Sequence, residues 1–443
     1  MDAHEVQLSL QATAEGAVKI ARTLGADQAE AGVSYDEGLT VTVRMGELEW
    51  VERQRDRAFA ITVYVGGRKG SASTAQCSPA AIEETARKAM SIASFTAEDR
   101  YAGLADERLM AQESLDLDLY HPWELSVEAA EELARRTEDV ARATDPKIKN
   151  SEGASVSTGG GVQVYANSHG FCGGYATTNH SLSCGVVAES GTALERDYWL
   201  SSARNAELLE TSEQVGAKAA HRTLRRLGAT QLSTRQVPVV YPAELARGLF
   251  GHLVAAIRGT SQYRRASFLL DACGEQIFPE FVEIDEDPFI PGAMGSAPFD
   301  NEGVAIQPRK LIENGVLRGY VLSSYSARRL GLQTTGNAGG VHNLVVKPTA
   351  GSIDQLLSDH PKIFLVGELL GQGVNTVTGD YSRGAAGFWV ENGEIVHPVH
   401  EVTIAGNLKD LFQGIRSVGS DVDMRGTVRC GSVLIEGLTV AGA

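Results

Sequence analysis

Cysteine is scarce and scattered in this chain of 443 residues. The five cysteines form no CxxC pair and are odd in number; they lie at Cys77, Cys172, Cys184, Cys273 and Cys430. This pattern excludes a disulfide framework and a zinc ribbon and favours reduced thiols. The segment MDAHEVQLSL has no basic start or apolar core of a signal peptide, and no apolar run approaches the length of a membrane span. We therefore expect a cytoplasmic protein that does not bind membranes.

Positive charge is also in short supply. The chain has 40 lysines and arginines against 56 aspartates and glutamates, which gives a formal net charge of -16. A nucleic-acid binder needs a basic face that neutralises phosphates, so this balance argues against a general nucleic-acid partner. The charge balance does not exclude a local basic patch.

Paired histidines of the zinc-peptidase type are missing. A helical zinc site needs two histidines about one turn apart, and no two of the ten histidines are four residues apart. The segment AELARGLFGHLVAAIRG, residues 243–259, has helical periodicity but carries only His252. His397 and His400 form the only close pair, and on a strand two residues three apart point to opposite faces. We interpret these histidines as packing or strand-end residues.

Other catalytic signatures are incomplete. No serine has glycine at both flanking positions of the nucleophile-elbow pattern, and Asp380, Ser382 and His397 have no sequence evidence for triad geometry. In IFLVGELLGQGVNT, Thr376 occupies the third glycine position of the dinucleotide fingerprint. The acidic stretch 280–287 lacks EF-hand spacing and is interpreted as a solvated loop.

A repeated order of elements organises the first two thirds of the chain. Helix, strands and helix follow one another twice, about 130 residues apart. The last third contains two Asn-Gly pairs between apolar runs, which predict tight hairpins. We predict an α+β protein with two helix–sheet–helix domains, 1–110 and 111–230, followed by a β-rich, barrel-like domain, 231–443.

The densest unusual stretch is GQGVNTVTGDYSRGAAGFWVENGEI, residues 371–395. Its glycines allow another backbone to approach closely, and its polar and aromatic residues could line a cleft for an extended peptide. The alternative is a structural turn and hairpin at a domain or subunit interface. The candidate contact residues for a peptide or partner are Asn375, Asp380, Tyr381, Arg383, Phe388 and Trp389.

Several segments resemble the TldD/PmbA family, once named modulators of DNA gyrase. They are GLFGHLVAAIRG, SSYSARRLGL, TTGNAGGVHN, RCGSVLI and above all the block at 371–412. The resemblance spans essentially the whole chain and implies three domains and cytosolic metallopeptidase work on unstructured peptides. It also implies a pair of paralogues, in which the TldD-like partner binds zinc through an HExxxH helix and a later cysteine.

The chain departs from that zinc motif. A rough alignment by the glycines places the two histidines of the paralogue near Gly251 and Ala255. Neither residue can ligate zinc, Leu253 cannot act as a base, and His252 is offset by one residue, or about 100° on a helix. Cys430 matches the position of the ligating cysteine. The resemblance thus implies no zinc and no catalytic residue in this chain.

Two hypotheses follow from the sequence. In the first, the chain is the non-zinc subunit of a peptidase complex, beside a TldD-like zinc-bearing paralogue that acts on unstructured peptides. In the second, the chain is a stand-alone peptide-binding or scaffolding protein, such as a homodimer. A protein-level effect on DNA gyrase is a third, weaker alternative.

Overall fold

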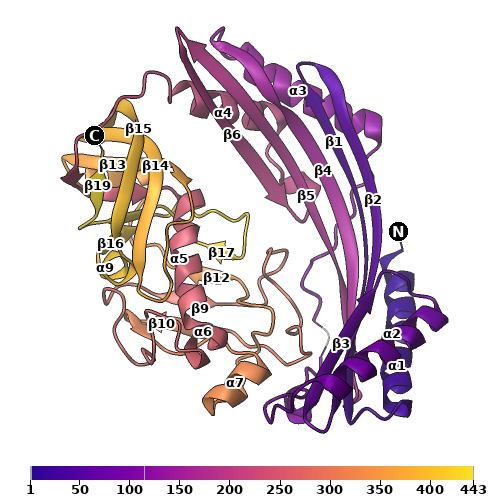
Figure 1. Cartoon of the computed structure of the whole chain (residues 1–443). Coiled ribbons are helices and arrows are strands. Elements are labelled where there is room, and N and C mark those ends of the chain that lie inside the picture. The colour runs from indigo at the N-terminus through magenta and orange to yellow at the C-terminus, as the bar shows by residue number, and fades with distance from the viewer. Residues whose placement is uncertain (1, 114, 443) are drawn as a thin grey trace.

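A computed structural model describes residues 2–113 and 115–442 and shows two bodies that face each other (Figure 1). The first body is a long, bowed antiparallel sheet with four helices. The second is the β-rich part that begins after residue 230. Among the described residues, no helix is long and apolar enough to cross a membrane.

Six strands form the bowed sheet in the order β3-β2-β1-β4-β5-β6. The strands of the first helix–sheet–helix unit join those of the second where β1 pairs with β4, from Glu30 opposite Asn167 to Val43 opposite Ala154. One continuous sheet therefore joins the two helix–sheet–helix units. The strands are β1 (Gln28–Arg44), β2 (Glu47–Val65), β3 (Arg68–Thr74), β4 (Ile148–Asn167), β5 (Cys172–Ser190) and β6 (Ala193–Ala203).

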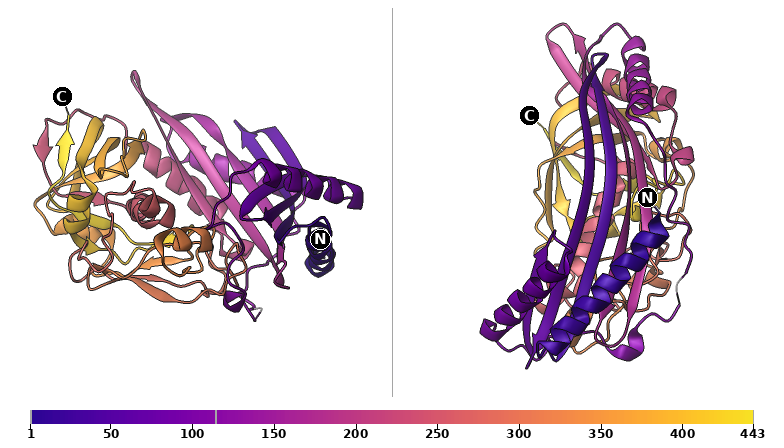
Figure 2. Two further views of the ribbon diagram at one scale, coloured as in Figure 1. Left: turned by 60° about the horizontal axis from the view of Figure 1, so that its bottom comes forward. Right: turned by 90° about the vertical axis from the view of Figure 1, so that its right-hand side faces the viewer.

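Two helix pairs cover one face of this sheet. Helices α1 (Ala3–Thr23) and α2 (Pro79–Phe95) pack on one end, and α3 (Val127–Ala143) and α4 (Ser212–Leu224) pack on the other. Burial alternates along β1, because its odd-numbered residues lie under these helices and the others face away. Figures 1 and 2 show α1, α2 and α3 on the convex side, so the uncovered face is the concave one.

The helix starts agree with their sequence signals. Ser78 caps α2, whose first residue is Pro79, and Thr211 and Gln214 form the capping box of α4. Each cap satisfies backbone N–H groups that a helix otherwise leaves without a partner. The predicted α+β class and the helix–strands–helix order of both units are confirmed.

The second body contains two mixed, curled sheets (Figure 2). The larger has the order β16-β18-β8-β13-β14-β15-β19-β7, and the smaller has the order β11-β10-β9-β12-β17. The larger comprises β7 (Arg235–Gln236), β8 (Val239–Tyr241), β13 (Lys362–Leu370), β14 (Asp380–Glu391), β15 (Glu394–Asn407), β16 (Ile415–Val418), β18 (Val433–Ile435) and β19 (Thr439–Ala441). The smaller comprises β9 (Ile284–Glu286), β10 (Arg309–Glu313), β11 (Val316–Leu317), β12 (Leu344–Val346) and β17 (Val428–Arg429).

Five helices accompany these sheets within the described residues, of which α5 is the longest. They are α5 (Ala243–Ile257), α6 (Gly259–Tyr263), α7 (Ser324–Leu330), α8 (Ile353–Ser358) and α9 (Leu408–Gln413). Both predicted Asn-Gly hairpins are present, with positive φ at Asn314, Gly315, Asn392 and Gly393. These turns need positive φ at both central positions, which Asn and Gly tolerate.

The two bodies touch at both ends of the bow. At one end, Arg222 pairs with Glu244 at 2.7 Å and Arg226 pairs with Glu368. At the other end, the Arg328 guanidinium donates to the carbonyl oxygen of Gly103 at 2.6 Å. These contacts hold α5 between the larger sheet and the concave face of the bowed sheet (Figures 1 and 2).

Candidate functional site

Helix α5 has one buried side and an exposed side on which two glycines lie beside Arg247, whose side chain reaches Asp423 at 3.7 Å. Leu249, Phe250 and Leu253 lie in the core of the second body, whereas Gly248 and Gly251 are exposed. A methyl group added at either glycine would meet nothing within 4 Å. The exposed stripe of α5 therefore borders open space on the side away from its core.

His252 lies at the edge of this stripe and packs against an aromatic residue. Its ring meets the ring of Tyr381 edge-on, with the centroids 6.2 Å apart, and the Tyr381 hydroxyl accepts from the Tyr241 hydroxyl at 3.4 Å. Burial lowers the pKa of His252, and the nearby charge of Arg383 lowers it further. The imidazole is therefore held neutral as a packing group.

Cys430 is fully buried at the other end of the same helix. Its sulfur lies 3.9 Å from the carbonyl oxygen of Ala243, the first residue of α5. Burial and, to a lesser degree, the charge of Asp423 raise the pKa of the Cys430 thiol to about 12. Ala243 precedes His252 by nine residues, or roughly 13 Å along a helix axis. The structure therefore does not bring His252 and Cys430 together.

The other histidine pair also fails to converge. His397 and His400 both lie in β15, as predicted, but they have different neighbours. His397 contacts the hydroxyl of Thr230 at 3.1 Å, and His400 lies 3.8 Å from the carboxylate of Glu401. Within residues 2–113 and 115–442, no three His, Cys, Asp or Glu side chains are placed to hold a metal ion. The zinc-free expectation for this chain stays a prediction.

The six candidate contact residues of 371–395 divide into two groups. Tyr381, Phe388 and Trp389 are buried, with 2%, 1% and 5% of their surface exposed. Phe388 lies under the guanidinium of Arg225 at the end of α4, 4.5 Å from its ring centre, and so at the junction of the two bodies. Of the three aromatic residues, Phe388 is thus the one placed at this junction, and peptide or partner contact by the three stays a prediction.

The polar group spans the turn before β14, which holds Asn375, and the start of β14, which holds Asp380 and Arg383. The Asn375 carbonyl side chain accepts from the backbone N–H of Val377 at 2.9 Å, and Asp380 accepts from the Thr378 hydroxyl at 2.6 Å. Arg383 is half-buried and donates to the carbonyl oxygen of Leu370 at 3.2 Å. Peptide or partner contact by these residues stays a prediction.

The glycines of the same block do permit close backbone approach. A methyl group at Gly373 would lie 1.9 Å from the carbonyl oxygen of Ser382, and one at Gly387 would lie 2.2 Å from that of Leu365. Only a residue without a side chain leaves room for these contacts. The glycine-rich block is therefore required by strand packing.

The sequence analysis missed the concave face of the bowed sheet. Hydroxyl groups meet there across the central strands: Thr40 contacts Ser157 at 3.0 Å and Thr42 contacts Ser155 at 2.8 Å. The next strand adds Ser181 and Ser183, which the register places opposite Ser157 and Ser155. Alternating Ser and Thr in β1 and β4 was the available signal, but only the pairing of distant strands makes it a surface.

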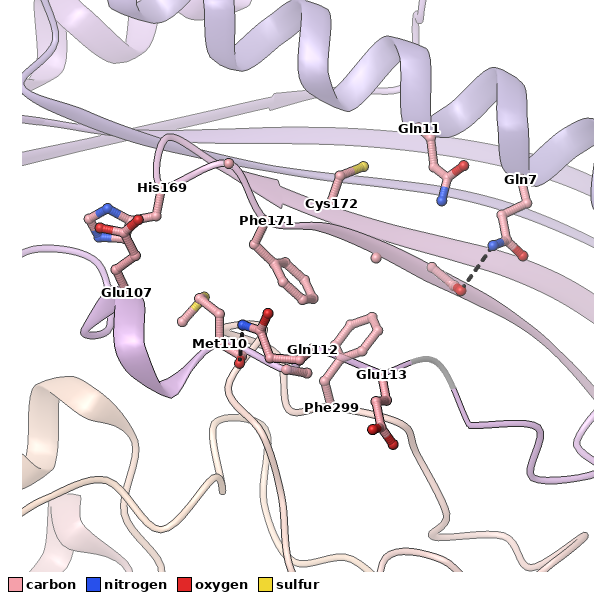
Figure 3. A pocket seen from close by; sticks show the side chains of 14 residues that line it. Gln7, Gln11, Glu107, Met110, Gln112, Glu113, His169, Phe171, Cys172 and Phe299 are labelled. Carbon is pink, nitrogen blue, oxygen red and sulfur yellow. Dashed lines mark hydrogen bonds between the residues drawn. The ribbon is translucent and has the colours of Figure 1, made fainter.

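A hollow lies near the start of β5 (Figure 3). It has a volume of about 590 Å³, and Gln7, Gln11, Phe171 and Phe299 are among the residues that line it. Gln7 donates to the carbonyl oxygen of Gly174 at 3.1 Å. Burial raises the pKa of Cys172 in this hollow to about 11, so the thiol is a poor nucleophile. Cys172 therefore supplies no activated nucleophile to this hollow.

Comparisons with known proteins assign the chain to a family. Models of the PmbA/TldA metallopeptidase domain 1, central domain and C-terminal domain match residues 29–93, 120–227 and 234–442. Metalloprotease PmbA of Escherichia coli O157:H7 is 49% identical over 94% of this chain and 92% of its own length.

Solved structures give the same result. A Bacteroides thetaiotaomicron protein named for modulation of DNA gyrase is 27% identical, with a TM-score of 0.92 and coverage of 97% of this chain and 98% of its own. TldE from Thermococcus kodakarensis, at 21% identity, has a TM-score of 0.86 and covers 97% of this chain and 99% of its own, and it shows the shared fold. The family models and the E. coli relative together show that the chain belongs to the PmbA/TldA metallopeptidase family.

Proposed function

We propose that this chain is the non-zinc subunit of a cytoplasmic two-subunit metallopeptidase that processes unstructured peptides. In this proposal, a TldD-like paralogue holds the zinc ion and carries out the hydrolysis. The observation that supports the proposal is the exposed stripe of α5, the helix that the resemblance aligns with the HExxxH helix of TldD-like paralogues.

The donor groups of this chain do not fit a zinc ion at that helix. Gly251 and Ala255, near the positions of the two histidines, offer no side-chain donor. His252 packs on Tyr381. Cys430 is buried, with a protonated thiol, beside the start of this helix, about nine helical residues before His252. A thiol must lose its proton to bind zinc, so burial works against metal binding. We therefore assign no catalytic step to this chain.

The same features suit a surface along which a peptide passes. The exposed glycines of α5 leave room beside the helix, and the concave face opposite it presents serine and threonine hydroxyls. A hydroxyl can both donate and accept, so it can pair with peptide amides in many registers. Such a wall would hold an unfolded chain without selecting one sequence.

Reconstitution tests this function. The purified chain and its TldD-like paralogue are assayed separately and mixed, with an unstructured peptide such as casein and mass spectrometry of the products. We expect cleavage only in the mixture, and its loss when zinc is chelated. Full activity of the paralogue alone would refute the supporting role, and cleavage by this chain alone would refute its zinc-free assignment.

A pull-down from the source cell separates this function from a stand-alone scaffold. Recovery of the zinc-bearing paralogue with the tagged chain is expected. Recovery of the chain alone would favour the peptide-binding homodimer instead, and the exposed α5 stripe would then be its candidate binding surface.

A further inference from the structure

Strand β5 has no neighbouring strand on its outer side near its start. Strand β6 pairs with β5 only from His180 to Ser190. Within the described part of the chain, no strand pairs with the outer side of residues 172–174. These three residues line the hollow of about 590 Å³ that Figure 3 shows. We call residues 172–174 the β5 edge.

The β5 edge directs backbone groups away from the sheet. Successive residues of a strand turn their N–H and C=O groups to opposite sides. The N–H of Asn167 in β4 donates to the Phe171 carbonyl oxygen at 2.9 Å, so Phe171 faces β4, and Cys172 and Gly174 face outward. Thr178, four residues after Gly174, likewise donates its N–H to a carbonyl oxygen outside the sheet.

A side-chain amide already binds one of these outward groups. Gln7 of α1 donates to the carbonyl oxygen of Gly174 at 3.1 Å, as the backbone N–H of an added strand would (Figure 3). The N–H groups of Cys172 and Gly174 and the carbonyl of Cys172 have no hydrogen-bond partner among the described residues. Unpaired backbone groups at a partly buried edge favour a partner that supplies N–H and C=O groups of its own.

The hollow has an aromatic side and a polar side. The rings of Phe171 and Phe299 lie on one side, with their centroids 5.2 Å apart. On the other side, α1 points Gln11 into the hollow and places the Glu15 carboxylate beside the Cys172 thiol. An added strand would direct its side chains alternately to these two sides. The hollow therefore suits alternating apolar and polar side chains.

The charge around the hollow is negative. Glu107 and Glu113 line it, Glu15 borders it, and no lysine or arginine is among its lining residues. None of these three carboxylates forms an ion pair with a residue that the structure describes. A site with charge of one sign attracts ligand groups of the opposite sign. The polar side chains of the occupant are thus expected to be basic.

We propose that the β5 edge binds an extended peptide segment, added as an outer strand, in which apolar and basic side chains alternate. Main-chain hydrogen bonds to Cys172 and Gly174 would supply affinity, and the two sides of the hollow would supply the side-chain preference. The volume of the hollow lies within the range of about 300–1,000 Å³ that is typical of ligand clefts. The proposal goes beyond the peptidase role, since every residue of the site belongs to this chain and binding needs no zinc-bearing paralogue.

Fluorescence anisotropy with the purified full chain tests the proposal. The probe is a fluorescein-labelled peptide of alternating valine and lysine, and in a control peptide glutamate replaces lysine. Two further peptides carry N-methyl groups on the backbone of all valines or of all lysines. An added strand turns only every second N–H toward β5, so one of these two peptides should lose binding and the other should keep it. Attraction between opposite charges alone would not distinguish them.

Variants of the chain test the same site from the protein side. Cys172→Pro removes an outward N–H at the first residue of β5, where a strand tolerates proline. Cys172→Ala is its matched control, because it removes the thiol and keeps the N–H. Glu15→Lys tests the charge, and Glu84→Lys on α2 makes the same charge change on an exposed residue outside the hollow. Melting temperatures report whether the variants are folded.

The wild-type chain, Cys172→Ala and Glu84→Lys are expected to bind the probe equally, and the glutamate peptide is not expected to bind. Cys172→Pro should weaken binding by at least about tenfold, and Glu15→Lys should weaken it several-fold at low salt. Equal binding of the two N-methylated peptides, or no saturable binding of the probe, would overturn the proposal. Loss of binding in Gly251→Trp but not in Cys172→Pro would also overturn it, because the peptide would then lie at α5. Inactivity of the reconstituted peptidase would leave this binding unaffected, so the two proposals fail separately.

Discussion

In the proposed function, single residues distinguish this chain from its zinc-bearing paralogue. On α5 the decisive positions are Gly251 and Ala255, which offer no donor atoms, and His252, whose ring is turned onto Tyr381. The matching cysteine is present but buried, and burial keeps its thiol protonated. Two measurements probe directly whether Cys430 is accessible and whether His252 is charged.

Cys430 should resist thiol reagents in the folded protein. Its pKa is raised to about 12 and it is fully buried, whereas Cys273 is exposed. Brief treatment with iodoacetamide at neutral pH, followed by peptide mass spectrometry, should label Cys273 and leave Cys430 unmodified until denaturant is added. Labelling of both at similar rates would show that Cys430 is accessible and would weaken the zinc-free assignment.

His252 should make the folded state less stable in mild acid. Burial lowers its pKa from the ordinary value of 6.5, so the unfolded chain binds a proton more readily than the folded one. Stability should therefore fall as pH drops below 6.5 toward the folded-state pKa. Urea unfolding at pH 7 and pH 5 should show a smaller loss for His252→Gln than for the wild type. Equal losses in both proteins would contradict the buried, neutral imidazole.

Local elements followed closely from local sequence signals. The caps at Ser78 and Thr211 and the Asn-Gly turns at 314–315 and 392–393 are short-range features, so neighbouring residues were sufficient to predict them. The joining of β1 to β4 is a pairing across more than a hundred residues, and no local pattern encodes it. For the same reason the hydroxyl-lined face and the burial of Tyr381 appear only in the folded chain.

Two glycines should respond in opposite directions to alanine. Gly251→Ala adds a methyl group in open space on a helix and should stabilise the fold by about 0.5–1 kcal/mol. Gly387→Ala would place its methyl group 2.2 Å from the Leu365 carbonyl oxygen, so it should lower the free energy of unfolding and distort the pairing of β13 with β14. Urea unfolding measures both. Destabilisation by Gly251→Ala would mean that the α5 stripe is covered.

The whole molecule consists of a bowed sheet and a β-rich body that meet at both ends of the bow, with α5 held between them. A large side chain on the exposed stripe of α5 should therefore affect peptide cleavage by the complex more than the stability of this chain. Gly251→Trp is expected to leave the melting temperature of this chain nearly unchanged and to slow peptide cleavage by the reconstituted pair. Glu84→Gln on the outer helix α2 is the control and should leave cleavage unaffected. Full activity with Gly251→Trp would remove α5 from the peptide path.

The zinc content of this chain, alone and in complex with its paralogue, tests directly whether the chain is the non-zinc subunit. Both samples are dialysed against a weak chelator and measured by elemental analysis. We expect no stoichiometric zinc in the chain alone and one zinc ion per pair in the complex. Near-stoichiometric zinc in the chain alone would contradict this expectation and would direct mutagenesis to His252, His397, His400 and Cys430.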